Sequence, residues 1–472
     1  MNVPMTRREA SRTIAVLTAS EAEGPVAADV SCRLGRDVKA EPRWLADFCG
    51  RDLGPRLDDL VVLAAAVEAS DRVVERPATG WRRDLHLCVP VRDLDFWASA
   101  SVGGELSGLL DFLTGDGWAF EFRHRRDPPQ VGRQGALPLP PGDVAVLPFS
   151  DGLDSLATAH LAPAREGGLR LVLLTVGPHV GRAGWRERGL GGTHHRARFP
   201  YSPPRGTDGA PRAREDSGRA RTFLYYTLAA VAAGLLGTPR VVVPEAGQGA
   251  LGSWLAQEGS ETPDLRCNPL FTRRLARWLA VVFETTPAAS DAVRFEHPHL
   301  WRTKGQVLAD LRESGRAAGW IVTRSCARHP RHMLHLLAPG RERVGCGFCS
   351  QCVLRQQSVL AAGLDAAPAW RERYVRREVP FERPAGDAMN DNDRSYAAAG
   401  AGMAARLARL ADGPPGPAIR AVAALAAETE RPSEEVARNM RALLSAHRAE
   451  VAALAATQGP GSLLRVCLGL AA

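Results

Sequence analysis

The sequence almost lacks lysine. Of its 60 basic residues, only Lys39 and Lys304 are lysine, and all the others are arginine. An ammonium is a compact point charge, whereas a guanidinium is a planar fork, so a lysine kept in such a chain is a candidate for a specific contact. The chain also lacks an uninterrupted apolar run near the roughly 20 residues that a membrane helix needs. We therefore expect no membrane partner and a cytoplasmic location.

Other missing features exclude further classes of protein. The chain shows no internal repeat and no G-x-x-x-x-G-K-[S/T] phosphate loop. Its nine cysteines are not spaced as a disulfide framework, because four of them cluster late in the chain. With 45% hydrophobic and 24% charged residues, the composition is that of a globular protein. The net charge of +8 permits contact with nucleic acid without requiring it, since arginine is spread along the chain.

A chain of 472 residues has room for two or three domains. Apolar strands alternate with helical patterns from about residue 143, which predicts a parallel sheet with helices on both faces. The Arg-, Gly- and Pro-rich residues 182–220 are expected to form a mobile loop. We divide the chain into a flexible N-terminus at 1–28, an α+β accessory domain at 29–142, the main α/β domain at 143–384 and a helical region at 385–472.

The first candidate site is the turn SDGLDS at residues 150–155, between a predicted strand and a predicted helix. Free backbone N–H groups and the positive end of the helix dipole suit a phosphate there. The hydroxyls of Ser150 and Ser155 add donors, and Asp154 is placed to hold Mg²⁺ on the phosphates. The alternative is a plain turn with Asp or Ser as the helix N-cap.

The second candidate site is a group of four cysteines, Cys326, Cys346, Cys349 and Cys352. Two overlapping C-x-x-C steps and an upstream cysteine supply the four thiolates of a closed tetrahedral Zn²⁺ site, which leaves no open position for catalysis. Two alternatives remain. An iron–sulfur cluster uses the same ligands, and one of three nearby histidines is able to replace a cysteine: His329, His332 or His335.

The order of these motifs resembles the 7-cyano-7-deazaguanine synthase (QueC) family of ATP pyrophosphatases. That family has a pyrophosphate loop, an arginine at a helix start, a T-K-[AG]-[EQ] segment and a closing cysteine cluster. The counterparts here are Ser150 to Ser155, Arg219 to Leu224, Thr303 to Gln306, and Cys326 with Cys346 to Arg355. The match covers about residues 143–365. The longer architecture looks like the QatC subunits of Qat anti-phage defence systems.

The resemblance implies a fold and a set of roles. The fold is the adenine nucleotide alpha hydrolase-like sheet, with Asp154 and Lys304 as catalytic residues. The substrate-binding residues are Arg219, Arg221 and Glu245. The nucleotide-binding residues are Ser150, Asp151, Gly152, Leu153, Asp154, Ser155 and Thr175. Two positions depart from the family pattern: Asp151 replaces a glycine and Ala220 replaces an asparagine.

The resemblance also implies an ATP-dependent ligase that uses Mg²⁺ and carries Zn²⁺. It activates a 7-deazaguanine-type carboxylate as an acyl-adenylate, releases pyrophosphate, and forms an amide or nitrile or transfers the acyl group to a protein amine. Two other hypotheses remain. The charge of Asp151 beside a triphosphate motivates a non-catalytic scaffold subunit with a protein partner in a defence complex. The basic net charge motivates a tRNA-modifying relative, although no cysteine pair lies near the loop.

Overall fold

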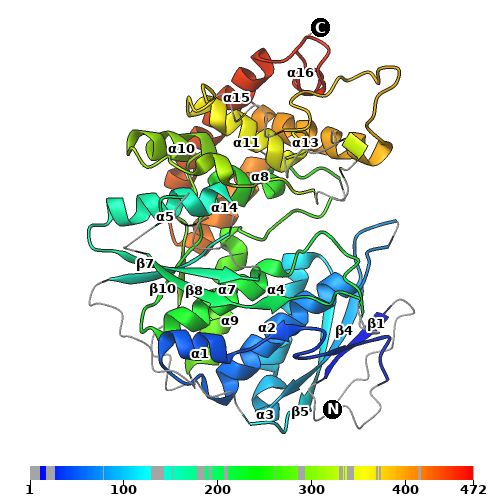
Figure 1. Cartoon of the computed structure of the whole chain (residues 1–472), viewed down its shortest axis with the longest axis vertical. Coiled ribbons are helices and arrows are strands. Elements are labelled where there is room, and N and C mark those ends of the chain that lie inside the picture. Colours follow the sequence, from blue (N-terminus) through cyan, green and yellow to red (C-terminus); the bar gives the residue numbers. More distant parts are fainter. Residues whose placement is uncertain are drawn as a thin grey trace.

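The computed structural model contains two parallel sheets and a set of helices above them (Figure 1). Asp151, His329 and His332 lie outside the residues it describes. The described residues are 11–17, 27–77, 79–128, 143–150, 152–177, 185, 188–190, 194–206, 211–259, 261–284, 293–328, 333, 335–336, 345–367, 370, 374–412 and 416–470.

The main domain is built on a five-stranded sheet in which all the neighbouring strands pair parallel. Its spatial order is β11 (Arg294–Glu296), β10 (Arg240–Val242), β6 (Val144–Pro148), β7 (Arg170–Val176) and β8 (His195–Phe199). Alternate residues of β6 and β7 enter two different hydrophobic cores, one on each face of the sheet. The expected parallel sheet with both faces covered is therefore confirmed for this region.

A second sheet of four strands forms the lower part of the molecule in Figure 1. Its order is β2 (Val30–Arg33), β1 (Ser11–Leu17), β4 (Asp84–Val91) and β5 (Gly117–His124), and every pairing is parallel. The expected α+β arrangement is therefore wrong for this sheet. The expected flexible N-terminus is wrong in part, because β1 lies between two other strands and buries Ile14 and Val16 in the core.

The two sheets share one hydrophobic core, which also contains helices α2 (Gly54–Val73) and α7 (Arg221–Leu235). Helix α2 packs on β4 and on α7, and α7 packs on β6 and β10. Nearly every residue of both helices is buried, and in α2 the buried residues include four acidic ones, Asp58, Asp59, Glu68 and Asp71. The other helices of this region are α1 (Arg43–Cys49), α3 (Leu94–Trp97), α4 (Glu105–Thr114) and α9 (Pro269–Glu284).

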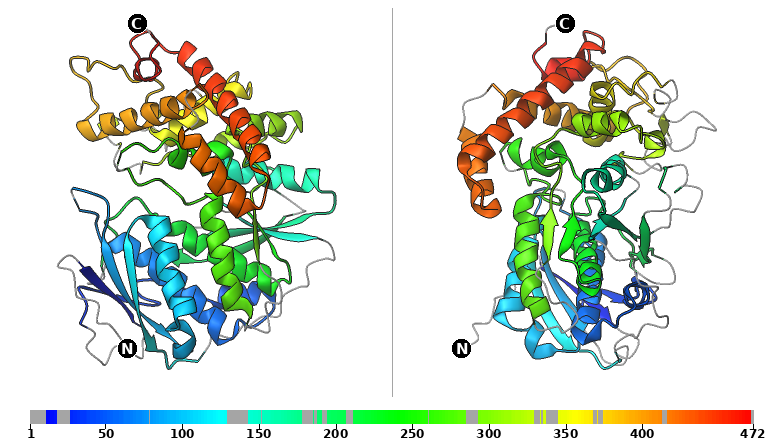
Figure 2. Two further views of the ribbon diagram at one scale, coloured as in Figure 1. Left: turned by 180° about the vertical axis from the view of Figure 1, so that it is seen from behind. Right: turned by 90° about the vertical axis from the view of Figure 1, so that its left-hand side faces the viewer.

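The opposite face of the five-stranded sheet is covered by α5 (Leu153–Arg165), which packs against α10 (Lys304–Glu313). The upper part of the molecule in Figure 1 also contains α8 (Gly247–Leu255), α11 (Ser350–Ala361) and the C-terminal helices. The C-terminal helices are α13 (Asp391–Arg409), α14 (Gly416–Thr429), α15 (Ser433–Ala456) and α16 (Leu463–Cys467). Figure 2 shows the long helix α15, in orange-red, crossing this upper part of the molecule.

Part of the expected mobile loop at 182–220 is regular structure. It contains β8 and also β9 (Tyr201–Ser202), which pairs antiparallel with β3 (Lys39–Ala40) and so joins the two sheet regions. Farther along, the backbone N–H groups of Arg214 and Glu215 donate to the carbonyl of Arg72. Across the described residues, none of the helices has both the length and the apolar character needed to span a bilayer.

Candidate functional site

The candidate site lies at the carboxyl ends of the five parallel strands. From β6 the chain passes to β7 and β8 on one side and returns to β10 and β11 on the other. The order of the strands therefore reverses between β6 and β10, and open α/β sheets bind ligands in the crevice at such a reversal. Ser150 and Asp154 follow β6 directly, and Glu245 follows β10.

Three charged side chains meet at this reversal point. Lys304, the first residue of α10, places its Nζ 2.7 Å from Asp154 Oδ2 and 3.8 Å from Glu245 Oε1. The lysine is buried, whereas the carboxylates of Asp154 and Glu245 remain 14% and 23% exposed. Two carboxylates thus share one ammonium at a position that solvent and a ligand are able to reach. Asp154 and Lys304, the two residues predicted to be catalytic, are therefore in direct contact.

The pKa values of the cluster follow from burial and from the surplus of carboxylates. Burial and the nearby Asp154 carboxylate raise the pKa of Glu245 to about 7, although Lys304 opposes that change. Burial alone would lower the pKa of Lys304, but Asp154 and Glu245 outweigh burial and raise it. Lys304 is therefore charged at neutral pH, and Glu245 changes its charge near neutrality.

The turn after β6 is ordered around two serines. Ser155 Oγ donates to the carbonyls of Ser150 and Gly152, and Ser150 Oγ lies 3.1 Å from Ser155 Oγ. The N-cap of α5 is Gly152, with no side-chain cap hydrogen bond among the described residues. The alternative prediction, in which a serine is the N-cap of this helix, is therefore wrong for the described residues. Leu153 contributes only backbone to the turn, because its side chain is fully buried in the core.

Thr175 lies near the end of β7, the strand next to β6. Its hydroxyl is buried, and it has no hydrogen-bond partner among the described residues. Burying a hydroxyl without a partner costs free energy. A ligand at the carboxyl edge of the sheet is one partner that would satisfy it, in line with the predicted nucleotide-binding role.

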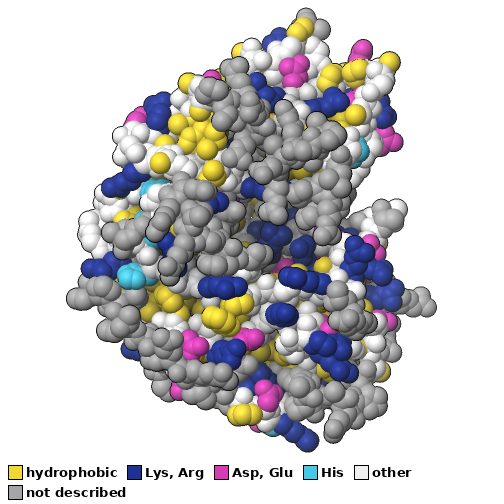
Figure 3. All heavy atoms as spheres, in the orientation of Figure 1, with side chains coloured by type: hydrophobic (Ala, Val, Ile, Leu, Met, Phe, Trp, Pro, Cys, Tyr) yellow, Lys and Arg dark blue, Asp and Glu magenta, His cyan; other side chains and the backbone are white. Residues whose placement is uncertain are grey.

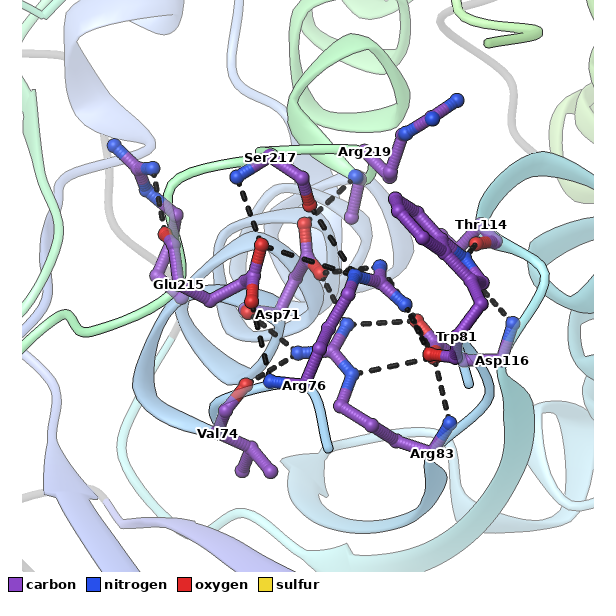
Figure 4. Close-up of polar contacts among 12 residues, drawn as sticks. Asp71, Val74, Arg76, Trp81, Arg83, Thr114, Asp116, Glu215, Ser217 and Arg219 are labelled. Carbon is purple, nitrogen blue, oxygen red and sulfur yellow. Dashed lines mark hydrogen bonds and ion pairs between the residues drawn. The ribbon is translucent and has the colours of Figure 1, made fainter. Parts of the chain in front are cut away.

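The two predicted substrate arginines lie in different surroundings. Arg219 donates to the backbone carbonyls of Thr262 and Pro263 and stacks on the ring of Trp81 (Figure 4). It also lies 3.6 Å from Asp264, a residue whose charge reaches Glu245. Arg221, the half-buried first residue of α7, is instead near enough to Glu68 of α2 for its charge to lower the pKa of that carboxyl. Arg219 is thus connected to the candidate site, and Arg221 belongs to a different neighbourhood.

Sequence reasoning missed the residues that hold Lys304 in place. Thr303 caps α10, and its hydroxyl donates to Glu450 of α15. Gln248 of α8 donates to Glu450 and accepts from the backbone N–H of Lys304 at 2.7 Å. The capping box of Thr303 and Gln306 was readable in the sequence as T-x-x-Q. No local pattern pointed to Glu450, because it lies 147 residues away from Thr303.

The four cysteines form a second, separate centre. One sulfur from each of Cys326, Cys346, Cys349 and Cys352 lies within 4.8 Å of all the others. The backbone N–H groups of Phe348 and Cys349 donate to Cys346 Sγ, an arrangement that stabilises a negatively charged sulfur. The donor set and its spacing are compatible with a zinc site.

The surroundings of this centre explain why the cysteines converge. Gly347 has φ of +89°, and a Cβ there would overlap the carbonyl oxygen of Arg376, so only glycine fits the turn between the ligands. Arg355 donates to Thr323 and Ser325 and thereby holds the segment that leads to Cys326. His335 bonds Asp393 of α13 and is not part of the sulfur cluster. Its predicted role as an alternative ligand has no support here.

Basic side chains gather on one face of the molecule. Figure 3 shows Lys and Arg side chains around a hollow between the upper helices and the sheets. Such a concentration of positive charge attracts anionic ligands. Comparison of the chain with protein-family models and with curated proteins found no match. The function must therefore be argued from the geometry.

Proposed function

We propose that the chain is an ATP-dependent adenylating enzyme of the 7-cyano-7-deazaguanine synthase type. The observation that carries the proposal is the meeting of Asp154, Lys304 and Glu245 at the strand-order reversal, beside the N-terminus of α5. An ammonium held among carboxylates next to free helix N–H groups suits the transfer of a nucleotidyl group, in which negative charge moves onto pyrophosphate.

In the proposed reaction a carboxylate oxygen of the acid attacks the α-phosphorus of ATP. The bond from that phosphorus to the bridging oxygen breaks, and pyrophosphate leaves with the electron pair. The exposed hydroxyl of Ser150 and the first N–H groups of α5 bind the leaving pyrophosphate, and Lys304 offsets its charge. Asp154 would hold Mg²⁺, which supplies further positive charge to the phosphates. An amine then attacks the acyl carbon and AMP leaves.

Glu245 is the proposed contact for a purine-like ring of the acid. A carboxylate accepts hydrogen bonds from ring N–H and amino groups, and Glu245 lies at the strand end where such a ring would sit. The carboxylate of Glu245 fits beside α8 because residue 249 is a glycine, since a Cβ at that position would overlap the carboxylate. The amine is ammonia, which gives an amide, or an amine of a protein partner in anti-phage defence. A nitrile requires a second ATP: the amide oxygen attacks the α-phosphorus, pyrophosphate leaves, and loss of AMP with that oxygen and of the two N–H protons forms the nitrile.

The cysteine centre has a structural role in this proposal. Four sulfur ligands would complete the coordination of Zn²⁺ and leave no position for substrate. Cys352 lies in α11, and α11 packs against both α10 and α13. The metal would thus fix the helix that supports α10, which carries Lys304.

The test is isotope exchange between pyrophosphate and ATP in the presence of 7-carboxy-7-deazaguanine. We expect exchange that requires the acid and is lost in Asp154→Asn. Asp143→Asn is the matched control, because Asp143 is an exposed acid just before β6, at the opposite end of that strand. Absence of exchange in the natural chain with any carboxy-deazapurine would overturn the proposal and favour the scaffold hypothesis. Mass spectrometry of co-purified proteins distinguishes the acceptors.

A further inference from the structure

The four-stranded sheet carries a group of metal-ligating side chains on the face that points away from its core. His86 and Cys88 are two residues apart on β4, so their side chains lie on the same face. Cys88 pairs in register with Glu121 on the parallel strand β5, which brings Glu121 to that face as well. Leu85, Leu87 and Val89 alternate with them and enter the hydrophobic core on the other side.

The spacing of these three side chains fits one metal ion. One ligand atom from each of His86, Cys88 and Glu121 lies within 4.8 Å of the other two, and Cys88 Sγ lies 3.5 Å from Glu121 Oε2. Ligands at zinc bond lengths of about 2.0–2.3 Å in tetrahedral geometry lie about 3.3–3.8 Å from one another. The cysteine–glutamate pair already has this separation.

The group is also held in place by its neighbours. Arg123 Nε donates to Glu121 Oε1 at 2.9 Å, which leaves Oε2 on the side of Cys88. Hydrogen bonds of this kind orient the ligands of natural metal sites. All three ligands stand on paired strands within a sheet, where the backbone ladder fixes their positions better than a loop would.

We propose that His86, Cys88 and Glu121 form a second metal site, which binds a divalent cation of the zinc class. One nitrogen, one sulfur and one carboxylate oxygen are ligands that Zn²⁺ and Co²⁺ accept together. His86 and Glu121 are only half-buried, so the fourth position is open to water or to an added ligand. This site differs from the closed four-cysteine centre in that respect and does not depend on the proposed adenylation.

The test is a metal count on the full-length protein, followed by titration with Co²⁺. After equilibration with Zn²⁺ and removal of free metal, we expect two equivalents in the natural chain. One equivalent is expected in Cys88→Ala and in Glu121→Gln. Cys32→Ala is the matched control, since Cys32 is a buried cysteine of the same sheet whose side chain enters the core instead. It should keep both equivalents.

Co²⁺ provides the second measurement, because a cobalt–thiolate bond gives a charge-transfer absorption band. The band that grows when Co²⁺ is added to protein holding one equivalent of Zn²⁺ should be absent in Cys88→Ala and weaker and shifted in Glu121→Gln, with an unchanged circular dichroism spectrum. A natural chain that holds one equivalent and shows no titrating band would overturn the proposal. So would two equivalents that both persist in Cys88→Ala.

Discussion

Two clusters of opposite charges differ in how they hold their carboxylates. In the lower part of the molecule, the guanidinium of Arg83 bonds Asp71 at 2.6 Å and Asp116 at 2.7 Å, and Arg76 adds a second fork on Asp116 (Figure 4). At the strand-order reversal, a single ammonium, that of Lys304, faces Asp154 and Glu245.

The difference lies in burial and in spare hydrogen-bonding capacity. Asp71 and Asp116 are fully buried and are held by planar forks, so their oxygens have little left to offer a ligand. Asp154 and Glu245 are partly exposed and share a point charge. The arginine cluster therefore stabilises the junction of α2, β5 and the segment before α7. The lysine cluster keeps acceptors available for chemistry.

The largest expected effect tests the arginine cluster. Arg83→Met removes the closest arginine from the buried Asp71 and leaves Asp116 with Arg76 alone, and it should lower the free energy of unfolding by about 3–5 kcal/mol. Denaturant unfolding of the full chain measures this loss. Arg82→Met is the control, because Arg82 forms only an exposed pair with Asp84. Equal stability of the two variants would remove the proposed distinction between the clusters.

The converse change is Lys304→Met in the lysine cluster. The exchange of pyrophosphate with ATP that requires the carboxylic acid substrate should become about 10²–10³-fold slower, the usual loss for one charge-stabilising group. The free energy of unfolding should change less than in Arg83→Met. Exchange kinetics and denaturant unfolding give the two readouts. Lys39→Met is the control, since Lys39 is the other lysine and is exposed. An unchanged exchange rate in Lys304→Met would contradict the proposed role of Lys304 in adenylation.

A smaller effect concerns pH. Because burial and Asp154 raise the pKa of Glu245 from 4.5 to about 7, the folded chain binds more protons than the unfolded chain between these values. Stability should thus fall as pH rises from 4.5 to 7, by about 1–3 kcal/mol from this group. Glu245→Gln should remove that part of the slope. Thermal unfolding at several pH values measures it, and an unchanged slope in the variant contradicts the assignment.

The smallest effect concerns the support of Lys304. Glu450→Gln places an amide N–H₂ group against the amide N–H₂ groups of Gln248 or Gln357, so two donors face each other. The substitution should lower the free energy of unfolding by about 1 kcal/mol. Because the lost contact displaces Lys304, the rate of exchange between pyrophosphate and ATP should fall about fivefold, with little change in the apparent KM for ATP. Glu434→Gln, an exposed change on the same helix, serves as the control. An unchanged exchange rate in Glu450→Gln would show that the contact between Glu450 and Thr303 contributes to stability and not to the position of Lys304.

Local patterns predicted the parts of the site that depend on local geometry. The alternation of strands and helices from residue 143 predicted the parallel sheet, and the C-x-x-C spacing predicted the sulfur cluster that includes Cys326. The rarity of lysine pointed to Lys304. Each of these signals comes from residues whose conformation is determined mostly by their near neighbours in the chain.

The rest depends on contacts between distant segments. Residues before 29 looked like a tail because their apolar run is short, yet β1 is completed by β2 and β4 on either side. The expected α+β domain became parallel because β4 and β5 are joined through α3 and α4, a crossover that strand patterns alone do not reveal. Glu450 was invisible for the same reason, since its partner Thr303 is remote in sequence.

The contact between Glu450 and Thr303 has a consequence for synthesis. Ribosomes make chains from the N-terminus, and the earlier domains fold first. The turn after β6, Lys304 and the cysteine centre therefore emerge well before α15, and the lysine gains its buried support only when that helix arrives. A nascent chain would carry every reactive group of the proposed site without the packing that aligns them. Docking of α15 would therefore coincide with the onset of activity.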